Sequence, residues 1–144
     1  MSAKYIASFA IGSLAGIANE VIQNPNHWCL TNPSVKSVVS CTVGNLYGWS
    51  ALMAVALFEH LDKVGVTTPL PKILIATVLA VSIEAIGGQI SKLFHKGKQT
   101  WKYPDSWYPM FGGSISLVSS IYFGIGIAAF YFFVQKVFKK PVYV

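Results

Sequence analysis

Long apolar segments alternate with short polar connections along this chain. Each segment is long enough to cross a bilayer as a helix, which takes roughly 20 mostly apolar residues. Lipid requires every spanning backbone group to bond within its own segment, and a helix does this. The pattern predicts an all-α fold, a polytopic membrane protein in which residues 1–144 form a single membrane domain. The four predicted spans form a four-transmembrane-helix bundle and cover residues 5–22, 38–58, 73–91 and 110–135.

Turn and breaker residues mark the three connections. Because proline cannot continue a helix, the prolines are expected outside the spans. They include Pro25, Pro33, Pro69, Pro71, Pro104 and Pro109. Four spans place both termini on the same side of the membrane. A cleaved signal peptide is the alternative for the first segment, with Ser13-Leu14-Ala15 as the cleavage site, but we expect a retained helix.

Composition supports the membrane assignment. Of 144 residues, 53% are hydrophobic and 11% are charged, whereas soluble domains average about 25% charged. The net charge of +6 comes from lysines, without a single arginine. These lysines cluster at the ends of the apolar segments, where they meet lipid head groups, and this argues against nucleic acid as a partner. Lysine counts barely distinguish the two sides, and only the pair Lys139-Lys140 favours cytoplasmic termini.

Small residues recur every fourth position in each predicted span. Such residues share one helix face and let helix backbones approach closely in lipid. They predict a compact bundle, or helices that also pack against partner proteins. The positions are Ser8, Gly12 and Gly16; Ser40, Gly44 and Gly48; Ala76, Ala80 and Gly88; and Gly112, Ser116, Ser120, Gly124 and Ala128.

Glu84 is the most informative polar residue, because it lies near the middle of the third span, where a bare charge is costly. One interpretation is a proton or cation site. The other is a structural hydrogen bond to Asn45, Gln89 or a serine of the fourth span. Glu20, Asn45, Glu84 and Gln89 together form the candidate intramembrane polar site.

Histidines and cysteines do not form a convincing metal site. His27, His60 and His95 lack the i, i+4 spacing of a helical metal motif; copper bound by His27 and Cys29 is a weaker alternative. Cys29 and Cys41 could form a disulfide in an oxidising compartment or stay free thiols. We find no nucleophile–base pair, phosphate-binding glycine loop or paired carboxylates, and so predict no catalytic residue, no metal and no cofactor.

The last connection is rich in aromatic residues. Trp101, Tyr103, Trp107 and Tyr108 are typical of an interfacial belt, where the rings are in apolar surroundings and their polar atoms reach water. A partner-docking surface or a substrate entrance is the alternative.

At this stretch the sequence resembles a family of small bacterial membrane proteins, the CmpB-like ABC-transporter permeases. The resemblance rests on Glu84, then Leu93-Phe94, Trp101-Lys102-Tyr103, Gly113-Ser114-Ile115-Ser116-Leu117 and Phe123-Gly124, with Gly16-x-x-x-Glu20 in the first helix. Similar proteins have aspartate after the tryptophan, where this chain has Lys102. The resemblance implies a fold type more than an activity. The chain also resembles small multidrug-resistance transporters in its size of four spans and in having an acid, Glu20, in the first helix.

Taken with the short connections, these features predict a protein that is not an enzyme by itself. We expect a non-catalytic accessory or structural subunit of a larger membrane complex. The alternative is a small oligomeric transporter or channel that uses Glu84, and Glu20, as a proton or cation site. The expected partners are the lipid bilayer and other membrane subunits or further copies of the chain.

Overall fold

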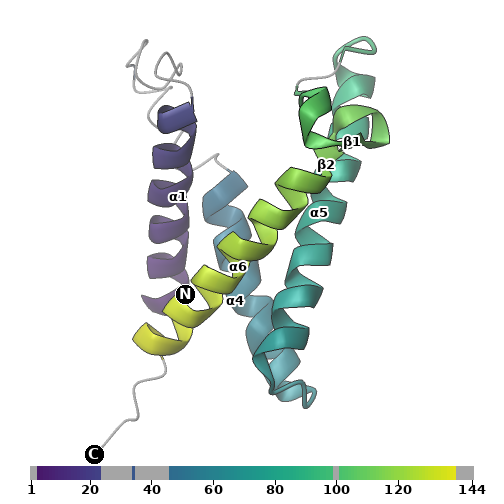
Figure 1. Cartoon of the computed structure of the whole chain (residues 1–144). Helices are drawn as coiled ribbons and strands as arrows, with labels where there is room; N and C mark the ends of the chain where they lie inside the picture. The colour runs from purple at the N-terminus through teal and green to yellow at the C-terminus, as the bar shows by residue number, and fades with distance from the viewer. Residues whose placement is uncertain (1–2, 24–33, 35–45, 99–100, 139–144) are drawn as a thin grey trace, which may run out of the picture. The chain divides into compact units, whose positions relative to one another are not determined.

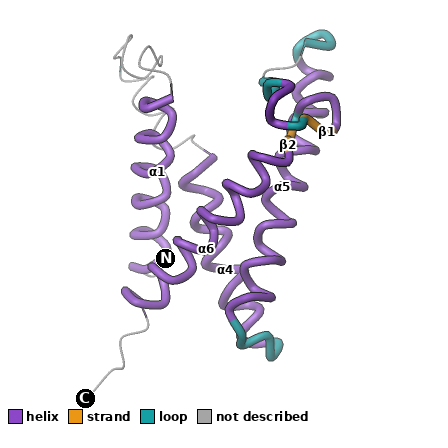
Figure 2. Tube along the Cα trace, in the orientation of Figure 1, coloured by secondary structure: helices purple, strands orange, loops and turns teal. Residues whose placement is uncertain are grey.

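The computed structural model describes residues 3–23, 34, 46–98 and 101–138 and is mostly helical (Figures 1 and 2). The chain divides into two compact units, residues 1–63 with 136–144, and residues 64–135. The long helices are α1 (Ala3–Gln23), α4 (Leu46–Lys63), α5 (Pro69–Phe94) and α6 (Leu117–Phe138). Between α5 and α6 lie the short elements η1 (Asp105–Trp107), β1 (Pro109–Met110), η2 (Phe111–Gly113) and β2 (Ile115–Ser116).

In the first unit, α1 and α4 pack side by side and antiparallel. Gly12 lies against Ala51 and the backbone of Tyr47, and Gly16 lies against the Tyr47 ring. From α4, Gly48 lies against Ser13 and Phe9. A Cβ on any of these glycines would collide with the opposite helix, so this close approach depends on their lacking side chains. The packing role predicted for these small residues is confirmed here, whereas Ser40 and Gly44 lie outside the described residues.

The second unit begins with α5, whose first turn contains two prolines. Pro69 starts the helix and Pro71 follows within the turn, whereas the sequence placed both in a connection. Proline is favoured at the start of a helix, because the first N–H groups have no intrahelical acceptor. The helix therefore extends four residues before the predicted start at Ile73 and three beyond Ser91.

The predicted helix at 110–135 begins later than expected. Residues 109–116 instead form a tight loop in which Pro109 pairs with Ser116 and Met110 with Ile115 in an antiparallel β-bridge. The loop turns through Gly112 and Gly113, whose φ angles are +67° and +89°. Residues other than glycine rarely adopt such φ angles, and an α-helix needs negative ones. A helix through 110–116 is therefore ruled out, although the segment is apolar.

Helix α6 begins with a reciprocal serine cap. The Ser119 N–H donates to Ser116 Oγ and the Ser116 N–H donates to Ser119 Oγ, both at 2.9 Å. This is the geometry of a capping box, with a serine in place of the usual glutamate. It explains why the helix starts at Leu117.

Contacts of α5 with the loop and with α6 follow an antiparallel register. Gly88 lies against Ser114 at the loop end, Gly124 faces Thr77 further along, and the Lys72 ammonium lies 5.6 Å from the centre of the Tyr131 ring. The last contact has the geometry of a cation–π interaction. The second unit is therefore a helical hairpin whose loop is itself folded.

Among the described helices, α5 and α6 are long and apolar enough to cross a membrane. Their large apolar side chains are widely exposed, for example Val78 (66%) and Ile125 (61%). Helices α1 and α4 do not meet the same test, and the predicted second span starts at Val38, outside the described residues. The helical fold class is thus confirmed, two of the described helices have the length and composition of a membrane span, and the four-span bundle stays a prediction.

Candidate functional site

Glu84 forms a pair with Tyr103, which reaches it from the loop between α5 and α6. The Tyr103 hydroxyl donates to Glu84 Oε1 at 2.8 Å. The other oxygen, Oε2, is buried and has no hydrogen-bond partner within the described structure. A buried carboxylate oxygen without a donor is costly, so this half of the carboxyl group is available for a proton or another ligand.

Tyr103 is held in place by its own neighbours. Its ring stacks on Trp107 with ring centres 5.7 Å apart, and Trp107 in turn contacts Tyr122 of α6 at 5.8 Å. The Tyr103 N–H donates to the Gly113 carbonyl at 3.1 Å. These contacts within the loop and with α6 orient the Tyr103 hydroxyl toward α5.

Gln89 holds the loop at a second point, one turn beyond Glu84. Its Nε2 donates to the Phe111 carbonyl at 2.8 Å and to Ser114 Oγ at 3.1 Å. Nearby, the Trp101 indole N–H donates to the Ser114 carbonyl at 2.9 Å. The structure thus gives Glu84 and Gln89 separate hydrogen-bond partners, both in the loop.

Two other candidates of the polar site are not placed by the structure. Asn45 and the side chain of Glu20 lie outside the described residues, as do His27, Cys29 and Cys41. Within the described part of the chain, no group of three metal-binding side chains gathers.

The aromatic residues of the loop play more than one part. Tyr108 is 68% exposed, as expected of an interfacial residue, whereas Trp101, Tyr103 and Trp107 are half-buried and hold the loop onto the hairpin. From the sequence, Tyr103 is expected in the interfacial aromatic belt, and its hydrogen bond to Glu84 is not predicted. The spacing of 19 residues carries no local signal for this pair.

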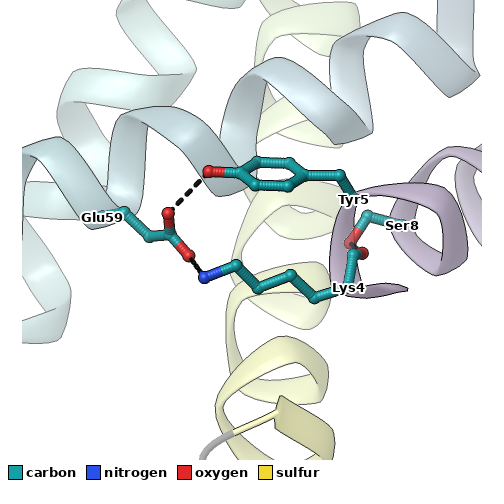
Figure 3. Close-up of polar contacts among 4 residues, drawn as sticks. All are labelled: Lys4, Tyr5, Ser8 and Glu59. Carbon is teal, nitrogen blue, oxygen red and sulfur yellow. Dashed lines mark hydrogen bonds and ion pairs between the residues drawn. The ribbon is translucent and has the colours of Figure 1, made fainter. Parts of the chain in front are cut away.

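A second polar cluster joins the ends of α1 and α4 (Figure 3). Lys4 forms an ion pair with Glu59 Oε1, and the Tyr5 hydroxyl donates to Glu59 Oε2 at 2.6 Å. Glu59 lies one residue beyond the predicted second span. The hydrogen bonds from Lys4 and Tyr5 hold the pKa of the Glu59 carboxyl below its usual value. The sequence analysis did not single out this cluster, whose members come together only because the helices are antiparallel.

Comparison with known proteins gives one match. The chain matches no curated protein and no solved structure. A family model matches residues 7–144, almost the whole chain, and its description reads "Putative ABC-transporter type IV". The match includes Glu84, Tyr103 and the loop that joins them. This chain therefore belongs to the CmpB family of ABC-transporter-type membrane proteins.

Proposed function

We propose that this protein is a small, non-catalytic membrane subunit of an ABC-transporter-related complex. In this proposal it crosses the membrane four times, with both termini on the cytoplasmic side. Its family membership over residues 7–144 is the observation that carries the proposal. The two helices that are long and apolar enough to cross a membrane also support it.

These 144 residues carry no sequence motif for ATP hydrolysis. ATP-hydrolysing proteins of this class need a glycine-rich loop of the form G-x-x-x-x-G-K-[ST] to bind phosphates. The 144 residues contain no such motif. In this proposal ATP is hydrolysed outside these 144 residues, and this subunit helps to hold the ATP-hydrolysing domain at the membrane or to couple it to a transport pathway.

A face of α6 supports contact with a partner helix. Tyr122, Ile125, Gly126 and Ala129 are exposed along one side of the helix. A Cβ added at Gly126 would meet no atom within 4 Å. An open face that contains small residues suits close packing by a second transmembrane helix.

The test is isolation of the tagged chain from its native membrane in a mild detergent, followed by a native gel. We expect migration with unrelated polypeptides, one of which hydrolyses ATP. The Gly126→Leu variant should lose these partners while the hairpin stays folded. Val78→Leu, which adds bulk at an exposed position of α5, is the matched control and should keep them. Migration of the wild type as a small homo-oligomer would contradict the subunit proposal.

The second candidate function is a small oligomeric transporter or channel. The observation that favours it is the buried, unpartnered Oε2 of Glu84 in a helix that is long and apolar enough to cross a membrane. Acidic groups in such positions commonly bind protons or cations. Loss of transport in a correctly folded Glu84→Gln variant would support this candidate over the subunit.

A further inference from the structure

An apolar hollow lies beside α5 under the loop. It has a volume of about 270 Å³ and is lined by Val81, Ser82, Ala85, Ile86, Phe111 and Ile115. The only hydroxyl among these side chains, that of Ser82, already donates to the Val78 carbonyl at 2.7 Å. The hollow therefore offers hydrocarbon contact and suits an apolar chain.

The same face of α5 leads from the hollow to a positive rim. Gln89 follows Ala85 by one turn, and Lys92 follows Gln89, with Lys92 Nζ 3.4 Å from Gln89 Oε1. From the middle of the hollow to Lys92 the helix rises about 12 Å, at about 1.5 Å per residue. This separation is shorter than a phospholipid, so one molecule can contact both places.

Two lysines lie against the turn formed by Gly112 and Gly113. The Lys92 ammonium would lie 2.9 Å from a Cβ at Gly112, and Lys102 Cγ would lie 2.6 Å from a Cβ at Gly113. Phe111, the residue before these glycines, lines the hollow. Two cationic side chains thus lie against the glycines that follow Phe111, a residue that lines the apolar hollow.

The charge around this end of the hairpin is strongly positive. Between residues 84 and 116 there are four lysines, at positions 92, 96, 98 and 102, and two acids, Glu84 and Asp105. The salt bridge found among the described residues, Lys4 with Glu59, lies in the other unit. An anion is therefore favoured here, whereas a plain apolar partner helix would leave these cations uncompensated.

We propose that this hollow and rim form a binding site for one anionic phospholipid of the bilayer. Its acyl chain occupies the hollow, and its phosphate binds the ammonium groups of Lys92 and Lys102. The site requires α5 to lie in the membrane but does not depend on any protein partner. Its test on the isolated chain is therefore separate from the test of the subunit proposal.

The experiment uses tryptophan quenching by brominated lipids. The full chain carries Trp28→Phe and Trp49→Phe, so that Trp101 and Trp107 report; Trp101 Cη2 would lie 3.8 Å from a Cβ at Gly87, next to the hollow. The protein is reconstituted in phosphatidylcholine vesicles with increasing amounts of dibrominated phosphatidylglycerol or dibrominated phosphatidylcholine. We expect half-quenching at a several-fold lower fraction of the anionic lipid.

Variants separate the two parts of the site. Lys92→Gln should reduce the preference for phosphatidylglycerol about fivefold, as expected for one lysine at a membrane surface, and Lys92→Arg should retain it. Lys136→Gln, at the opposite end of α6, is the control and should leave the preference unchanged. Ala85→Phe should fill the hollow and weaken quenching, whereas Val78→Phe, outside the hollow, should not.

Circular dichroism establishes that each variant keeps its helices. Equal quenching by both brominated lipids would overturn the proposal, and so would an unchanged preference in Lys92→Gln. Reversal of the quenching by inorganic phosphate would also overturn it, since a free anion would then be the ligand. Absence of quenching by either lipid would show that something other than lipid fills the hollow.

Discussion

The two units hold their helices together in different ways. In the pair α1–α4, glycines bring the backbones into contact, and the polar residues Lys4, Tyr5 and Glu59 join one end. In the hairpin α5–α6, a folded loop ties the helices through hydrogen bonds to Glu84 and Gln89. Both units contain a close glycine contact, which in the hairpin is that of Gly88 with Ser114, but the hairpin depends in addition on hydrogen-bonding side chains that hold its loop.

This difference predicts different sensitivities. Added bulk should break the first pair, because a glycine contact between backbones cannot yield without moving a whole helix. The hairpin should instead respond to the loss of single hydrogen-bonding groups, since each buried group left alone costs free energy.

The largest effect is expected from Gly16→Leu, which drives a side chain into the Tyr47 ring. We expect the α1–α4 pair to lose about 3 kcal/mol of stability. The measurement is SDS-induced unfolding followed by the fluorescence of Trp49, whose ring meets Phe9 of α1 edge-on at 5.2 Å. Ala10→Leu adds bulk on the exposed side of the same helix and should leave the midpoint nearly unchanged. Equal midpoints for both variants would refute the backbone-contact explanation.

The next effect is expected from Tyr103→Phe, which leaves both oxygens of Glu84 without a donor. The hairpin should lose about 1–3 kcal/mol, the cost of an unsatisfied buried polar group. Thermal unfolding of the purified chain measures this, with Tyr108→Phe at an exposed position as the control. Adding Glu84→Leu to Tyr103→Phe should restore part of the stability, because both polar partners are then removed. A double variant less stable than Tyr103→Phe alone would argue against the pair.

Glu84→Gln alone should change stability by less than about 1 kcal/mol, because glutamine keeps an acceptor for Tyr103 and membrane hydrogen bonds are weak on average. The same unfolding assay measures this change. If the subunit proposal holds, complex formation should also be preserved. A folded variant that has lost all activity would instead assign Glu84 to proton or cation transport.

The smallest effect concerns pH and the Lys4–Glu59 ion pair. The folded-state pKa of Glu59 is lowered, so its stabilisation is present above the unfolded pKa of about 4.3 and is lost as pH falls through the folded value. The side chains are 37% and 31% exposed, and such pairs contribute at most about 1 kcal/mol. The SDS concentration at which half of the wild type is unfolded should decrease as the pH is lowered from about 5 to the folded pKa of Glu59. Glu59→Gln should be less stable than the wild type at pH 7 and show a smaller fall; parallel curves would contradict this assignment.

Much of the fold could be predicted from local patterns. Helical spans follow from apolar runs, and the packing of Gly12, Gly16 and Gly48 follows from their spacing. The loop at 109–116 was missed because its residues are as apolar as a helix. Only the pair Gly112-Gly113 after Pro109 marked the turn, and glycines also occur within membrane helices.

The candidate site was harder to predict, because the residue that contacts Glu84 depends on how the loop after α5 folds back onto that helix. Glu84 stands out because it is an acid in an apolar segment, but no pattern in the neighbouring sequence predicts its contact with Tyr103. The loop folds back only when Gly113 adopts its positive φ and accepts the Tyr103 N–H. Such a pairing is set by three-dimensional structure and not by spacing.

The sequence distance spanned by these contacts bears on the order in which the protein is made. In the hairpin, the bonds from Trp101 and Tyr103 join residues 13 and 19 positions apart. In the first unit, Tyr5 and Glu59 are 54 positions apart. Closing a shorter loop costs less entropy and is faster. During synthesis, α1 must therefore wait for α4, whereas the loop of the second hairpin can fold once the residues up to Ser119 have left the ribosome. Helix α1 is consequently without its packing partner for longer during synthesis than α5 is without the loop that packs on it.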